Sequence, residues 1–180
     1  MVDRIKTLRD LIFRLANRAA GEFEWEAMLA RAERKTGLHD WGNLEFCEPF
    51  RILIAALQNE ARLNQVGFFI LRHHYHRLLC NLLKLVEDWK RYPQIADVPL
   101  NDPIFIVGFP RTGTTFLHGL IAQDPAFRSL RYWELLFPSP PPVPSTPAGD
   151  PRINQARRFV YWIDKISPRL SAIHELDAMG

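Results

Sequence analysis

The sequence contains few cysteines, and their placement excludes a disulfide framework. Among 180 residues there are two, Cys47 and Cys80, which lie 33 positions apart in apolar segments with helical spacing. Neither belongs to a CxxC pair of the kind that metal or redox sites use. Isolated cysteines in apolar segments are usually buried and inert. We therefore predict two buried free thiols.

Long hydrophobic runs are also missing. The most apolar stretch, residues 66–71, ends at Arg72-His73-His74, whereas a helix that spans a membrane needs about 18 apolar residues. The N-terminus has no apolar core followed by a cleavage site of small residues, and its first serine is Ser129, unlike a transit peptide. We expect no transmembrane segment and a cytoplasmic location.

The chain also has no strong excess of charge of either sign. The chain has 23 Lys and Arg against 20 Asp and Glu, a net charge of +3 with histidine neutral. This small excess argues against a nucleic-acid partner but suits a small anionic ligand. A hydrophobic content of 47% is enough for a real core, so a disordered chain is not expected.

Helical periodicity dominates the sequence from residue 3 to about residue 92. We predict helices over residues 5–19, 24–35, 49–63 and 64–92, with Gly37 ending the second and Asn64 capping the fourth. Three histidines, at positions 73, 74 and 76, fall inside the fourth helix. Because no Asp, Glu or Cys occupies a matching position, we predict no metal site.

The pattern changes after Pro99. Residues 103–108 form a short apolar run that ends in glycine and predicts a buried strand, and residues 127–132 predict a second one. Between them, residues 114–123 return to helical spacing. A proline-dense loop or linker follows at 138–144, and Asp150-Pro151 caps a last helix that ends near Pro168.

The loop between the first strand and its helix predicts an anion site. It has the GxxxxG spacing of a nucleotide-binding P-loop, but Thr114 stands where that motif requires lysine. Successive loop N–H groups and the positive end of the helix would still point at one phosphate. Arg111 lies within the loop, so its charge could reach a group that this phosphate carries.

Six residues form the core of this loop: Pro110, Arg111, Thr112, Gly113, Thr114 and Thr115. They resemble the 5′-phosphosulfate-binding loop of sulfotransferases, which reads Pro-Lys/Arg-Ser/Thr-Gly-Thr-Thr. The setting is similar too, with an apolar strand before the loop, a helix after it and Tyr132-Trp133-Glu134 ahead of the prolines. The chain most resembles bacterial members of the family that carry a helical N-terminal extension.

The resemblance implies transfer of a sulfuryl group from 3′-phosphoadenosine 5′-phosphosulfate to a hydroxyl or amine, without a metal. It implies that residues 110–115 bind this donor and that Arg111 opposes charge on the transferred group. The acceptor would be a small molecule, a glycan or a lipid. Glu134 is the first candidate for the base, because some relatives place a catalytic glutamate after the second strand. In the alternative interpretation, Glu134 only starts a helix or pairs with Arg131. His174 is the second candidate for the base.

The resemblance also implies an α/β fold, with a P-loop-like, three-layer arrangement around a parallel sheet. Only two strands are predicted after residue 100, so we expect an incomplete sheet, preceded by an all-helical region over residues 1–99. Residues 100–180 would be the N-terminal part of the α/β domain. Two other functions stay open: a P-loop phosphotransferase that uses a nucleotide, and an inactive helical interaction fragment.

Overall fold

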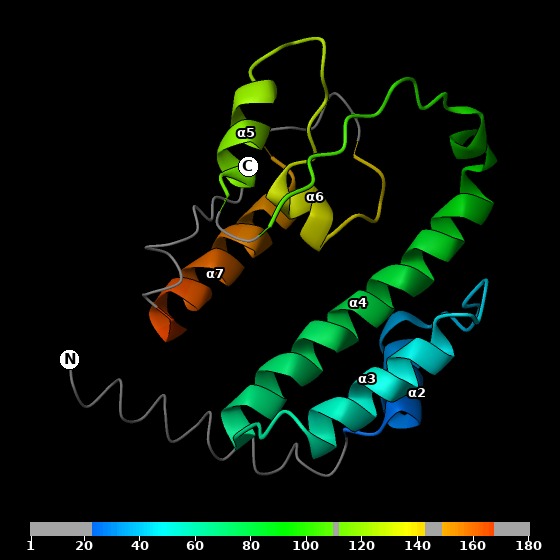
Figure 1. Cartoon of the computed structure of the whole chain (residues 1–180). Coiled ribbons are helices and arrows are strands. Elements are labelled where there is room, and N and C mark those ends of the chain that lie inside the picture. Colours follow the sequence, from blue (N-terminus) through cyan, green and yellow to red (C-terminus); the bar gives the residue numbers. More distant parts are fainter. Residues whose placement is uncertain (1–22, 110–111, 143–148, 168–180) are drawn as a thin grey trace. The chain divides into compact units, whose positions relative to one another are not determined.

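The computed structural model describes residues 23–109, 112–142 and 149–167 and consists of helices joined by loops (Figure 1). The chain forms two compact units, Met1–Tyr92 and Pro93–Gly180. The first contains α2 (Trp25–Thr36), α3 (Cys47–Asn59) and α4 (Gln65–Arg91). The second contains a short 3₁₀ helix, η2 (Pro93–Asp97), and then α5 (Thr114–Ile121), α6 (Tyr132–Leu136) and α7 (Pro151–Ile166). The helix predicted over residues 5–19 lies outside the described residues.

Local capping signals set several helix ends where the sequence predicts them. Gly37 ends α2 with φ 72°, a left-handed conformation that glycine adopts without strain, and its N–H donates to Glu33 O at 2.7 Å. The side chain of Asn64 accepts a hydrogen bond of 2.8 Å from Gly67 N and begins α4. Asp150 begins α7 in the same way, accepting from Arg152 N. These three predictions are confirmed.

The end of α3 differs from the prediction. The helix begins at Cys47 and holds Pro49 in its first turn, but it stops at Asn59 rather than near residue 63. Arg62 has φ 47°, a conformation that a right-handed helix cannot continue through. The chain therefore turns four residues earlier than its apolar pattern indicates.

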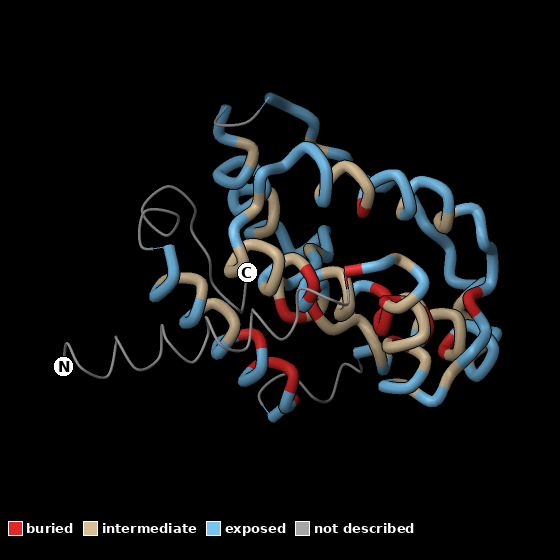
Figure 2. Tube along the Cα trace, turned by 90° about the horizontal axis from the view of Figure 1, so that it is seen from below, coloured by how far each residue is buried: buried red, intermediate tan, exposed pale blue. Residues whose placement is uncertain are grey.

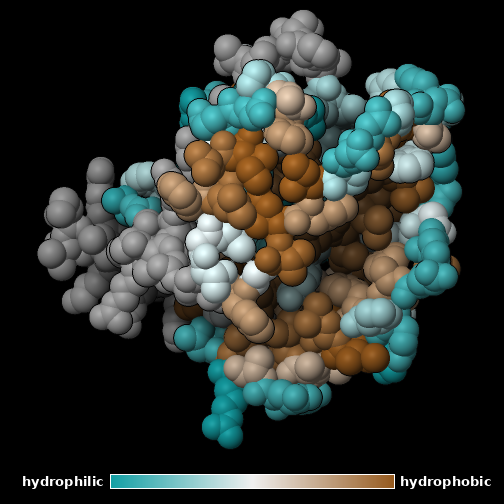
Figure 3. All heavy atoms as spheres, turned by 45° about the horizontal axis from the view of Figure 1, so that its top comes forward, coloured by the Kyte–Doolittle hydropathy of each residue, from teal (hydrophilic) through white to brown (hydrophobic). Residues whose placement is uncertain are grey.

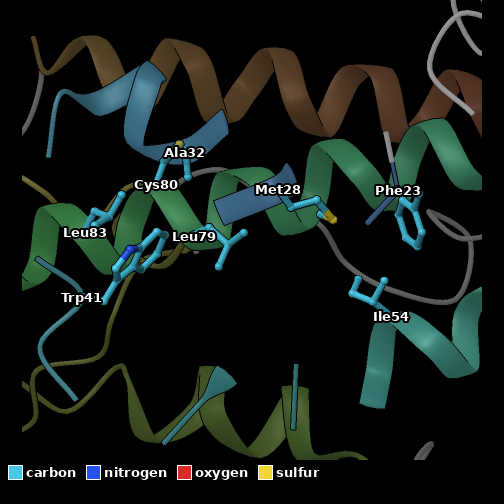
Figure 4. Packing of buried hydrophobic residues seen from close by; sticks show 8 residues of the cluster. All are labelled: Phe23, Met28, Ala32, Trp41, Ile54, Leu79, Cys80 and Leu83. Carbon is cyan, nitrogen blue, oxygen red and sulfur yellow. The ribbon is translucent and has the colours of Figure 1, made fainter. Parts of the chain in front are cut away.

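The core of the first unit lies where α2 packs against α3 and α4. Figure 4 labels its eight buried residues, Phe23, Met28, Ala32, Trp41, Ile54, Leu79, Cys80 and Leu83. Burying a large apolar side chain of this kind stabilises the fold by about 1.5–3 kcal/mol. Both cysteines are free as predicted; Cys80 is buried, whereas Cys47 is only half-buried.

The second unit has a smaller core between α6 and α7. Trp133 and Leu136 of α6 are buried against Ile153 and Ala156 of α7. Figure 2 shows how few stretches of the trace are buried (red) compared with the exposed ones (pale blue). A five-residue helix is unstable by itself, so this packing is what keeps α6 in place.

The predicted parallel sheet is not confirmed, because the described residues contain no strand. Residues 103–109 and 127–131 are irregular, and Phe105 and Val107 are 81% and 91% exposed. A strand exists only through hydrogen bonds to a neighbouring strand, so an apolar run without such a neighbour stays irregular. Many other large hydrophobic side chains are exposed as well, and Figure 3 shows one face of the molecule on which hydrophobic residues (brown) reach the surface over broad areas.

In the described part of the chain, no helix combines the length and the apolar character that crossing a membrane requires.

Candidate functional site

In the predicted anion loop, the side chains of Thr112 and Thr114 lie close to Gly108. Thr112 Oγ1 donates a hydrogen bond of 2.7 Å to Phe109 O, which closes the turn. A Cβ atom added to Gly108 would lie 2.9 Å from Thr112 Oγ1 and 2.9 Å from Thr114 Cγ2. Real Cβ atoms do not come so close to their neighbours. This arrangement of the Thr112 and Thr114 side chains therefore depends on glycine at position 108.

The loop leads directly into the N-terminus of α5. Gly113 is the N-cap with φ 87°, and a Cβ atom there would meet no atom of the described residues within 4 Å, so these residues leave space beside the helix end. The first intrahelical bond runs from Leu117 N to Gly113 O at 3.0 Å. The N–H groups of residues 114–116 therefore have no acceptor within the helix, and they carry the positive end of its dipole. An anionic group could be bound there.

Two residues of the predicted loop, Pro110 and Arg111, lie outside the described residues, as does His174. The structure describes Thr112, Gly113, Thr114 and Thr115 of the same motif. Thr114 is half-buried and Thr115 is exposed. The roles of Arg111 and His174 therefore stay predictions.

Glu134 lies in the first turn of α6, and the described residues before it form no strand. Its Oε2 accepts from Arg131 N at 2.8 Å, which caps the helix, and its Oε1 accepts from Arg128 Nη2 at 3.0 Å. The side chain is only 10% exposed. Glu134 thus starts a helix, as one sequence interpretation holds, but its ion-pair partner is Arg128 and not the side chain of Arg131. These contacts fix the direction in which the carboxylate points.

Arg152, at the second position of α7, was not singled out by the sequence analysis. Its guanidinium is held by both oxygens of Asp150, with Nη2 to Oδ2 at 2.6 Å. It also donates to Phe137 O and lies over the Trp133 ring, 4.7 Å from its centroid. The hydrogen bonds that the guanidinium of Arg152 donates to Asp150, with the one from Arg152 N, lower the pKa of Asp150 below its usual value.

A signal for Arg152 was present in the sequence. The first turn of a helix is the positive end of its dipole, where a cation is unfavourable unless something else compensates it. The Asp-Pro-Arg string at 150–152 puts an arginine at such a position.

No cluster of three or more His, Cys, Asp or Glu that could hold a metal ion occurs among the described residues.

The sequence from residue 103 to residue 178 matches the model of the Sulfotransferase family. This range contains the glycine loop, α5, α6 and α7. This segment is therefore similar to sulfotransferases. The resemblance stated for the loop sequence is therefore confirmed.

Two solved sulfotransferase structures are similar to the chain. Sulfotransferase STF1 of Mycobacterium tuberculosis H37Rv has 33% identity and a TM-score of 0.70, over 78% of this chain and 39% of that one. Sulfotransferase STF9 of Mycobacterium avium has 26% identity and a TM-score of 0.69, over 77% of this chain and 35% of that one. The likeness covers more of the chain than the second unit alone, so it includes part of the helical region.

The chain spans less than two fifths of the length of each of these sulfotransferases. No curated protein matches it.

Proposed function

We propose that the protein is a sulfotransferase that moves a sulfuryl group from 3′-phosphoadenosine 5′-phosphosulfate to an acceptor hydroxyl or amine. The observation that supports this most is the glycine loop closed on Gly108, which opens into the N-terminus of α5 within the sulfotransferase segment. The 5′-phosphate of the donor fits the N–H groups of residues 114–116, which have no acceptor within α5, and the space that the described residues leave beside Gly113.

Different residues of the loop would contact different groups of the donor. The N–H groups of residues 114–116 and the hydroxyls of Thr114 and Thr115 would bind the phosphate that becomes the leaving group. Arg111, inside the same loop, would oppose the negative charge that grows on the sulfuryl group and on this phosphate during in-line attack. Fixing the donor before the reaction lowers the entropic part of the barrier.

For the base we propose Glu134. A carboxylate offers about four lone-pair sites, and the contacts with Arg131 N and Arg128 Nη2 use one on each oxygen. The remaining sites could accept the proton of the acceptor hydroxyl. The alternative is a glutamate that only caps α6, in which case His174 becomes the base. Exchange of Glu134 for glutamine separates the two roles.

The acceptor would be a small molecule, a glycan or a lipid, and we place the reaction in the cytoplasm. The domain that carries it would begin near residue 100, after a helical region over residues 1–99. The acceptor contacts would come from segments other than the donor loop, because these vary independently within a fold.

Calorimetry tests the donor assignment. The protein is titrated with adenosine 3′,5′-bisphosphate, the product nucleotide, in a buffer that contains EDTA, and separately with ATP and Mg²⁺. We expect the bisphosphate to bind without a metal and more tightly than Mg-ATP. Equal or tighter binding of Mg-ATP would overturn the proposal in favour of a nucleotide-dependent phosphotransferase. Binding of neither ligand would favour an inactive helical fragment.

A further inference from the structure

Arg152 is a buried cation at an unfavourable place. It is 8% exposed and occupies the first turn of α7, next to the positive end of the helix dipole. Burying a charge is costly unless it is paired and its hydrogen-bonding groups are satisfied. Its neighbours must therefore compensate this cost.

The compensation comes from two directions. On its own helix, Arg152 Nε donates to Asp150 Oδ1 and Oδ2 at 3.0 and 3.1 Å, and Nη2 donates to Oδ2 at 2.6 Å. Across the second unit, Nη1 donates to Phe137 O at 3.0 Å and to Pro140 O. The Trp133 ring covers the guanidinium on one side. This fork geometry needs the planar guanidinium of arginine, which lysine cannot reproduce.

The contacts with Phe137, Pro140 and Trp133 join Arg152 to the segment that carries Glu134. Phe137 is the C-cap of α6, so its carbonyl lies at the negative end of that helix. Trp133 is the neighbour of Glu134 in the chain. At the other end of α6, Glu134 itself closes the first turn by accepting from Arg131 N. Arg152 thus holds one end of a five-residue helix whose other end orients the candidate base.

We propose that Arg152, fixed by Asp150, is a positioning residue for the sulfuryl-transfer site, acting through α6 on Glu134. The inference rests on the proposed function and adds a residue to it. Arg152 itself makes no contact with the donor in this role. Loss of its fork would let α6 and the following proline segment move, and a shift of about 1 Å at a catalytic group can cost 10²-fold in rate.

The test compares Arg152→Lys with Arg157→Lys, an exposed arginine on the same helix that serves as the matched control. Hydrogen exchange of residues 132–142 reports on α6, calorimetry reports on bisphosphate binding, and steady-state kinetics report on kcat and KM. For Arg152→Lys we expect faster exchange in 132–142, a kcat reduced about 10- to 100-fold, and a bisphosphate Kd within about twofold of the unaltered protein. Arg157→Lys should match the unaltered protein in all three.

A second variant removes the partner of Arg152 instead of Arg152 itself, so that the test does not depend on the folding of Arg152→Lys alone. Asp150→Asn keeps a good N-cap for α7 but removes the carboxylate that pairs with the guanidinium. It should reproduce the faster exchange and the lower kcat in milder form. Unchanged exchange of residues 132–142 in both variants would overturn the proposal.

A double-variant cycle separates this inference from the assignment of the base. If Arg152 acts through Glu134, the fall in kcat caused by Glu134→Gln should be much smaller in the Arg152→Lys background than in the unaltered protein. Fully additive losses would refute positioning while leaving Glu134 as the base. Near-normal kcat of Glu134→Gln alone would instead refute the base assignment, and the exchange data would still decide whether Arg152 orders α6.

Discussion

Replacing Gly108 with alanine should open the anion loop while leaving the rest of the protein folded. The added Cβ would lie 2.9 Å from Thr112 Oγ1 and 2.9 Å from Thr114 Cγ2. Both are side-chain atoms of the loop, so the overlap can be relieved only if the Thr112 and Thr114 side chains turn or the loop moves. Thr112 cannot move without weakening its hydrogen bond of 2.7 Å to Phe109 O.

The size of the effect follows from these two contributions. A lost hydrogen bond of this kind costs about 0.5–1.5 kcal/mol, and overpacking by one methyl group costs about 1–3 kcal/mol. If the loop relaxes in the free protein and must close again on the donor, this cost appears as lost affinity. Together the two contributions amount to about 1.5–4.5 kcal/mol. Since about 1.4 kcal/mol corresponds to a factor of ten, we expect bisphosphate binding to weaken by about 10- to 1000-fold.

Gly119 offers a matched control in the helix that follows the loop. A Cβ at this position would meet no atom of the described residues within 4 Å, and the residue lies inside α5. Alanine is favoured over glycine in a helix by about 1 kcal/mol. Gly119→Ala should therefore keep the bisphosphate affinity and raise the melting temperature slightly.

Isothermal calorimetry and thermal unfolding of both variants provide the measurement. Gly108→Ala should bind the bisphosphate more weakly and keep a far-ultraviolet circular dichroism spectrum like that of the unaltered protein. Equal bisphosphate affinity in Gly108→Ala and Gly119→Ala would show that the compact loop is not the donor site.

Three further predictions concern single side chains. Arg111→Ala should remove a charge-assisted contact worth about 1.5–3 kcal/mol in donor affinity or kcat/KM, and kinetics that stay unchanged would remove Arg111 from the site. Glu134→Gln should lower turnover by about 10²–10⁴-fold with little change in donor affinity; if Glu134 only caps α6, turnover stays near normal and stability falls by about 1 kcal/mol or less. Burial, and to a smaller extent nearby positive charges, lowers the pKa of His76 below 6.5. The unfolded chain then takes up the proton first, so the free energy of unfolding should fall as the pH drops below about 6.5. Urea unfolding at pH 7.5 and 5.5 should show a smaller fall for His76→Gln, and an equal fall in both proteins would contradict this.

Features that depend on neighbours in the chain followed from the sequence. Gly37 ends a helix because only a residue that tolerates positive φ closes that turn, and Asn64 and Asp150 begin helices because their side chains reach N–H groups two or three residues ahead. The glycine loop belongs to the same class, since its glycine spacing and the following helical pattern are local. The family resemblance was stated on this loop, and the match over residues 103–178 confirms it.

Features that depend on residues distant in the sequence could not be predicted from the sequence. The apolar run at 103–108 predicts burial, but a strand forms only beside another strand, and the described residues contain none. Likewise, only the folded chain brings Arg152 to carbonyls 12 and 15 residues away, and only there does Glu134 meet Arg128. Local sequence determines where helices begin and where the anion loop turns, because those hydrogen bonds span a few residues. Tertiary packing decides which charges meet, because that depends on how segments separated by loops fold against each other.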